Sequence, residues 1–196
     1  MVSSSALERT CSANTCAVRT NGQLVCFGEN EFGECDVPAD LGAVLVVSAG
    51  TTHTCAVQTN GQLVCFGDNR FGECDVPADL GPVLAVSAGH CHTCALRTDG
   101  QLVCFGDNAF EECDVPAGLG PVLAVSAGRC HACAVRADGQ LVCFGDNACG
   151  QCDVPADLGP VLAVSAGNSF TCAVKTNGQI VCFGTNSCGQ CDVLNR

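Results

Sequence analysis

The strongest constraint on this chain is a 39-residue period in its cysteines. Cysteine returns at this spacing in three columns, without an insertion or a deletion. The columns are Cys16, Cys55, Cys94, Cys133 and Cys172; Cys26, Cys65, Cys104, Cys143 and Cys182; and Cys35, Cys74, Cys113, Cys152 and Cys191. A strict period of this size is typical of one supersecondary unit stacked on copies of itself, as in solenoids and propellers. We therefore place five repeats, at about 5–43, 44–82, 83–121, 122–160 and 161–196, in a single domain that spans 1–196.

Each repeat has the pattern of three short strands. In the unit that runs from residue 81 to 119, the valine-rich run 82–86 and the segments 92–97 and 101–105 all have strand length. Small or polar residues with glycine separate these segments, and no stretch shows helical periodicity. Proline occurs only between strands or at a strand's first residue, where no ladder hydrogen bond is lost. We therefore expect an all-β fold with about three to four antiparallel strands per repeat.

The turn between the second and third strands predicts how the first two cysteine columns face each other. If Thr59-Asn60-Gly61 is a three-residue loop with Gly61 in the left-handed position, Cys55 lies opposite Cys65. The Cα atoms of such a pair are about 4.5 Å apart, which is within disulfide range. The hypothesis is five equivalent disulfides: Cys16–Cys26, Cys55–Cys65, Cys94–Cys104, Cys133–Cys143 and Cys172–Cys182. The alternative is ten buried thiols that pack as small apolar side chains.

The other ten cysteines have no partner that the spacing fixes. They are the third column and the irregular Cys11, Cys91, Cys130, Cys149 and Cys188. Two C-x-x-C motifs contain a glycine that would let both thiols turn towards one ion, and they make Cys149, Cys152, Cys188 and Cys191 candidate ligands of zinc or copper. A cysteine-rich metal-binding or thiol-storage protein is therefore the alternative function.

The charge of the chain bears on its partners. Eight Lys and Arg stand against 20 Asp and Glu, for a formal charge of −12, so phosphate backbones and anionic membranes are poor electrostatic matches. The 20 cysteines favour an extracellular or secretory compartment, although the N-terminus shows no signal-peptide core. No catalytic constellation stands out from the repeat background, and we expect neither enzymatic activity nor a cofactor.

The repeat resembles that of the regulator-of-chromosome-condensation family of β-propellers. The matching stretches are Ser48-Ala49-Gly50, His53-Thr54-Cys55-Ala56-Val57, Asn60-Gly61, Phe66-Gly67-Asp68-Asn69 and Gly72-Glu73-Cys74, and the likeness covers all five repeats. It implies a propeller of five blades, closed as a ring or open as part of a longer array. Cys-Phe-Gly stands where many members have Trp-Gly, and the chain lacks tryptophan. No loop protrudes like the wedge of the chromatin-bound exchange factor, and the net charge of −12 argues against docking on DNA, so the family's exchange activity is not carried over.

The resemblance and the loop pattern together indicate a non-catalytic scaffold that binds a protein. Specificity on repeat scaffolds resides in the residues that differ between copies. We expect a protein partner on one ring face, no nucleic acid or membrane partner, and a monomer. The candidate partner-binding residues are His90, Arg129, Asn168 and Arg70. The pattern places the first three, after the small-small-Gly turn, on one side of the ring and Arg70 on the other.

Overall fold

The computed structural model describes residues 14–193, and strands are its only regular elements. The first repeat contributes β1 (Asn14–Val18) and β2 (Leu24–Gly28). Each later repeat contributes three strands: β3 (Val44–Ala49), β4 (His53–Gln58) and β5 (Leu63–Gly67); β6 (Val83–Ala88), β7 (His92–Arg97) and β8 (Leu102–Gly106); β9 (Val122–Ala127), β10 (His131–Arg136) and β11 (Leu141–Gly145); β12 (Val161–Ala166), β13 (Phe170–Lys175) and β14 (Ile180–Gly184). The predicted all-β fold of antiparallel strands is confirmed.

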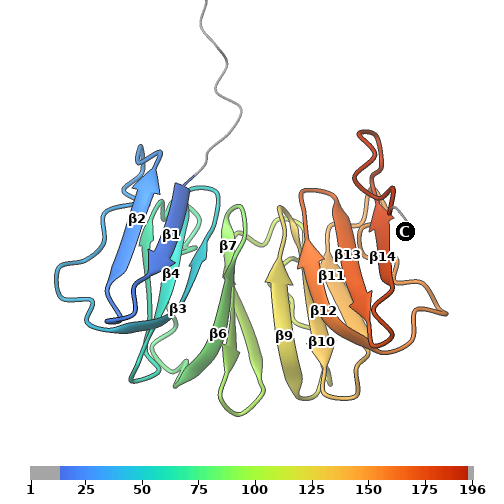
Figure 1. Ribbon diagram of the computed structural model, residues 1–196, viewed down its shortest axis with the longest axis horizontal. Helices are drawn as coiled ribbons and strands as arrows, with labels where there is room; N and C mark the ends of the chain where they lie inside the picture. The colour runs from blue at the N-terminus through green and yellow to red at the C-terminus, as the bar shows by residue number, and fades with distance from the viewer. Residues whose placement is uncertain (1–13, 194–196) are drawn as a thin grey trace, which may run out of the picture.

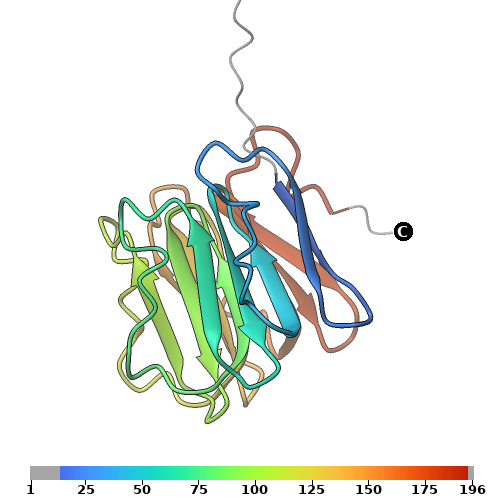
Figure 2. The same cartoon turned by 90° about the vertical axis from the view of Figure 1, so that its left-hand side faces the viewer.

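The five sheets are blades that follow one another along an arc (Figure 1). The first and last sheets lie at opposite ends of the row, and the view from the side shows the middle sheets displaced away from both ends (Figure 2). The substantial contacts between sheets all join consecutive repeats. Closure by an N-terminal strand beside the last blade would involve residues 5–8, which lie outside the described residues.

The blades converge at their first strands. β3, β6, β9 and β12 contact one another in turn, and the middle strand of each blade packs on the first strand of the next. The first strand of each three-stranded blade contains a bulge, because its second residue has no partner across the ladder. Those bulged residues are Leu45, Leu84, Leu123 and Leu162, and all four are largely exposed.

Each hairpin has the predicted register. Gln58 and Gln62 close the loop through a backbone hydrogen bond of 2.8 Å, and Gly61 takes a φ of +84°. Cys55 therefore lies opposite Cys65, and the equivalent pairs do the same in the other four hairpins. A disulfide joins each pair, with a Cα separation of 4.1 Å in all five. The core beneath them consists of one apolar cluster per pair of adjoining blades.

Glu111 has a backbone conformation that its side chain disfavours. Glu111 has a φ of +63°, whereas the equivalent positions hold glycine with φ between +76° and +82°: Gly33, Gly72, Gly150 and Gly189. We expect Glu111→Gly to raise the free energy of unfolding by about 1 kcal/mol, because the left-handed region costs glycine nothing. Urea unfolding would measure the change, and Gly72→Glu should lower stability by a similar amount. An unchanged midpoint in both variants would contradict this account.

Candidate functional site

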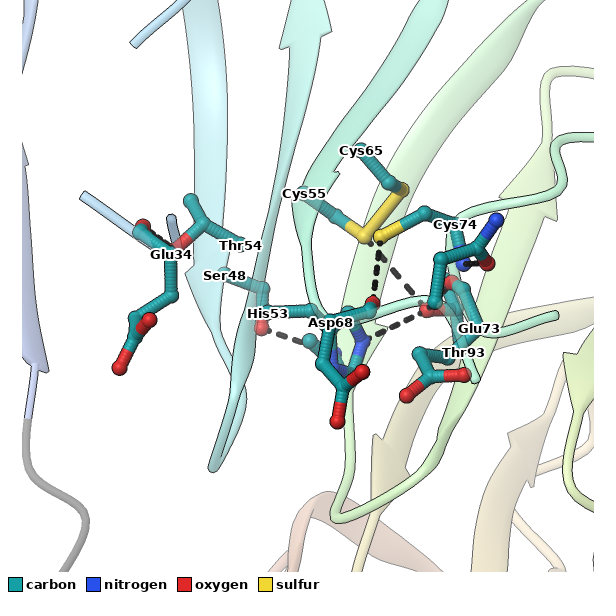
Figure 3. Close-up of a disulfide and its surroundings, with 12 residues drawn as sticks. Glu34, Ser48, His53, Thr54, Cys55, Cys65, Asp68, Glu73, Cys74 and Thr93 are labelled. Carbon is teal, nitrogen blue, oxygen red and sulfur yellow. Dashed lines mark hydrogen bonds between the residues drawn. A yellow bond between two sulfur atoms is a disulfide. The ribbon is translucent and has the colours of Figure 1, made fainter. Parts of the chain in front are cut away.

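Polar side chains join neighbouring blades at a recurring junction (Figure 3). His53 Nε2 lies 2.9 Å from the hydroxyl of Thr93 in the next blade, and that hydroxyl donates to the carbonyl of Glu73 at 2.9 Å. His131 and Thr171 form the same contact at 3.0 Å. His53, Thr93 and Thr171 are fully buried, so each junction fixes the angle between two blades.

The junction between the third and fourth blades lacks one bond. His92 is fully buried, but the next blade presents Ala132 where the others have threonine, and neither ring nitrogen of His92 has a hydrogen-bond partner among the described residues. An unsatisfied buried polar group costs about 1–3 kcal/mol. This junction is therefore the weakest of the described set.

Restoring the missing hydroxyl should stabilise the fold. In Ala132→Thr, the new side chain can accept from His92 and donate to the carbonyl of Glu112, as Thr93 does one repeat earlier. We expect a gain of about 1 kcal/mol in the free energy of unfolding, measured by denaturant titration. Ala132→Val, which fills similar space without a hydroxyl, is the control and should not give this gain. Equal gains from both variants would contradict the hydrogen-bond account.

Burial keeps the junction histidines neutral. It lowers the pKa of His53, His92 and His131 to about 4 in each case. Each imidazole also packs against the glycine of a Ser-Ala-Gly turn. A Cβ on Gly89 would lie 2.6 Å from the carbonyl oxygen of Gly128 and 2.7 Å from His92. These groups are structural: they are enclosed, and they hold the blades in place.

The third cysteine column forms thiol–carbonyl contacts within each repeat. Cys74 Sγ donates to the carbonyl of Asp68 at 3.2 Å (Figure 3), and Cys113 does the same to Asp107 at 3.1 Å. Burial, with acidic neighbours, raises the pKa of both thiols to about 12. They are protonated at neutral pH and are poor nucleophiles and poor metal ligands.

The structure does not assemble a metal centre from the C-x-x-C motifs. Cys149 and Cys188 are exposed, whereas Cys152 and Cys191 belong to the third column and donate to backbone carbonyls. Burial raises the pKa of Cys152 to about 11. Within residues 14–193, no group of three or more His, Cys, Asp or Glu is placed to hold a metal ion. In that same part of the chain, no helix is long and apolar enough to cross a membrane.

Three buried glutamates have a structural role in the loops after the outer strands. The backbone N–H of the residue two positions earlier donates to each carboxylate: Phe32 to Glu34 at 2.9 Å, Phe71 to Glu73 at 2.8 Å, and Phe110 to Glu112 at 2.7 Å. Gln151 makes the equivalent bond to Cys149 at 2.9 Å, so the contact does not need a charge. Although burial raises the pKa of Glu112, the glutamine in the next repeat indicates loop closure rather than proton transfer.

A central depression of about 260 Å³ lies where the first strands meet, and it is the best candidate for a site. The Ala-Gly pairs of four repeats form its frame. The residue after each glycine differs from repeat to repeat, and these four residues line it: Thr51, His90, Arg129 and Asn168. Three of the four residues that the sequence suggested for partner binding are thus brought together, and Thr51 joins them.

Arg70 lies at the same end of the molecule, and the predicted separation of the two loop sets was wrong. Each hairpin returns its chain to the end where it began, and the amide of Asp68 donates to the carbonyl of Thr52 at 2.9 Å. Arg70 forms a 2.6 Å ion pair with Asp68 and lies 5.0 Å from the ring centroid of Phe32 in the preceding blade. We call this end of the molecule, with both sets of loops, the loop face.

Fold and repeat together define a propeller-type repeat protein with a loop face at one end. The family model for the regulator of chromosome condensation (RCC1) repeat matches residues 44–73, 83–111, 122–151 and 161–190. The chain belongs to this family. A comparison with curated proteins finds no match.

Solved structures agree with this assignment. The ectodomain of the Physcomitrella patens receptor kinase CR4 is 26% identical, with a TM-score of 0.74 over 87% of this chain and 50% of that one. The CRINKLY WD40 ectodomain of the Arabidopsis thaliana receptor kinase ACR4 is 24% identical, with a TM-score of 0.68 over 87% and 62%. Yeast RCC1 (Prp20), solved with Kap60, is 17% identical, with a TM-score of 0.76 over 89% and 55%. The chain thus spans 50–62% of the length of these proteins.

Proposed function

We propose that this chain is a non-catalytic scaffold that binds a protein partner through its loop face. The observation that carries the proposal is the contrast between a repeated frame and four different polar residues around one depression. The Ser-Ala-Gly turns are the same in the last four repeats, while Thr51, His90, Arg129 and Asn168 differ in size, charge and hydrogen-bonding capacity. Different residues on a constant frame around one depression are the pattern of a recognition surface on a repeat scaffold.

The charge balance and the relatives support a protein as the partner. A net charge of −12 opposes binding to nucleic acid. Yeast RCC1, which shares the fold, was solved bound to Kap60 and studied for its binding to Gsp1p and histones. The five disulfides and the likeness to two receptor-kinase ectodomains favour an oxidising compartment as the place of action.

Affinity capture with two matched variants tests this proposal. The loop-face variant replaces Thr51, His90, Arg129 and Asn168 by alanine. The control variant replaces by alanine three exposed turn residues at the opposite end of the molecule: Thr59, Thr98 and Thr176. The fourth repeat already has alanine, Ala137, at this position. The loop-face variant should capture at least tenfold less of a partner that the native chain enriches, and the control variant should capture as much as the native chain. Capture that survives the loop-face changes, or that fails equally with both variants, would overturn the proposal.

A further inference from the structure

The central depression contains a cation that the rest of the fold leaves unpaired. Three arginines each form an ion pair with a nearby aspartate: Arg70 with Asp68, Arg97 with Asp99, and Arg136 with Asp138. Arg129, like Arg19 and Lys175, forms no ion pair with any residue in the described range 14–193, but Arg129 alone of these three lines the depression. In a chain with a net charge of −12, an unpaired arginine in a concave site is available to an external anion.

The positions of the lining residues are fixed by the backbone. Thr51 N donates to the carbonyl of Gly89 at 3.1 Å, His90 N to that of Gly128 at 3.2 Å, and Arg129 N to that of Gly167 at 3.2 Å. These bonds run from each repeat to the next, so the variable residues start from a rigid ring of turns. A site formed before its ligand arrives loses less entropy on binding.

Neutral donors flank the cation. His90 and Arg129 come from consecutive repeats, and Arg129 is close enough to contribute, after burial, to the lowered pKa of the His90 imidazole. Thr51 and Asn168 add a hydroxyl and an amide on the two sides. The guanidinium fork can bind a carboxylate through two parallel hydrogen bonds, and a neutral imidazole can donate a third.

We propose that the central depression binds a carboxylate side chain of an acidic segment in the protein partner, held by Arg129 and His90 with Thr51 and Asn168 at its edges. This inference rests on the proposed function and adds the chemistry of the partner. A carboxylate fits better than a phosphate, because Glu73 and Asp107 lie near enough to influence His90 and would repel a dianion more strongly than a monoanion. The site is thus suited to one negative charge.

Titration with short peptides tests the proposal. The probe is a blocked peptide with a single carboxylate (Ac-Gly-Glu-Gly-NH2), followed by isothermal titration calorimetry and by the NMR signal of His90. The matched peptide with glutamine in place of glutamate and inorganic phosphate are the other two arms. We expect the glutamate peptide to bind at least tenfold more tightly than either and to shift the His90 resonance. Tighter binding of phosphate, or equal binding of the glutamine peptide, would overturn the carboxylate assignment.

Two variants separate site binding from general electrostatics. Arg129→Gln should lower the affinity for the glutamate peptide at least tenfold. Arg97→Gln removes the same charge at the opposite end of its blade and should change the affinity by less than twofold. Equal losses in both variants would overturn the inference. If loop-face capture succeeds while the glutamate peptide fails, only the carboxylate inference falls. If the peptide binds while capture is insensitive to the loop face, the proposed function falls.

Discussion

Lowering the pH from 7 to 4 is expected to remove much of the stability of this fold, because three buried junction histidines must stay neutral. The pKa of His53, His92 and His131 is about 4 in the folded chain, against 6.5 in the unfolded chain. The unfolded state therefore binds more protons. The stabilisation is complete above pH 6.5 and is lost progressively as the pH falls towards 4. Each site contributes at most about 3 kcal/mol, so the three together approach the stability of a typical domain.

Phenylalanine variants isolate this effect. The fifth repeat already carries Phe170 at the junction position, packed on the glycine of its own Ser-Ala-Gly turn. The triple change His53→Phe, His92→Phe and His131→Phe should flatten the loss of stability between pH 6.5 and 4, measured by urea unfolding at a series of pH values. Glu112, whose pKa burial raises, shifts stability with pH in the opposite direction, and Glu112→Gln removes that contribution. An equally steep loss in the triple variant would exclude the histidines as its cause.

Reduction of the disulfides should have the second large effect. Each closes a hairpin with a sequence separation of 10 residues, and loop-closure entropy assigns about 3 kcal/mol to such a bridge. We expect a reductant to lower the urea midpoint strongly. The double variant Cys55→Ala, Cys65→Ala should lose about 3 kcal/mol, since it leaves the other four bridges in place. Cys188→Ala, which removes an exposed free thiol, is the control and should lose less than 0.5 kcal/mol.

Alkylation before and after reduction gives an independent measurement. In denaturant without reductant, label should enter the nine free cysteines of the described range and leave the ten hairpin cysteines untouched. Peptide mapping assigns Cys11 separately. Label on both members of the hairpin pairs before reduction would show that these columns are packed thiols instead.

The local structure of each repeat could be predicted from sequence because it depends on short-range chemistry. Gly61 sets the loop, the loop sets the register, and the register places Cys55 beside Cys65. The blade-to-blade junction could not be read in the same way. His53 and Thr93 are 40 residues apart, in consecutive repeats. A single repeat read alone predicts that the histidine is buried, but it does not show which residue its ring contacts. The family pattern marked the position but not its contact.

The candidate site was partly predictable for a related reason. Variation between copies singled out His90, Arg129 and Asn168 without any knowledge of their positions in space. It could not show that they share one depression, which depends on how the first strands converge. Arg70 was predicted at the wrong end of the molecule, because the prediction did not take into account that the hairpin reverses the chain. The second strand of a repeat runs away from the Ser-Ala-Gly turn and the third runs back, so the loop that carries Arg70 lies at the same end as that turn.

Within residues 14–193 the substantial contacts between blades join consecutive repeats, and this has a consequence for the history of the gene. Every junction uses nearly the same side chains, so a blade can follow any other blade. Duplication or loss of the DNA that encodes one whole repeat would yield a chain that is longer or shorter by one blade and still packs at every junction between blades. The uniform spacing of the copies suits this kind of growth, and the residue after each Ser-Ala-Gly turn can then diverge without disturbing the joints.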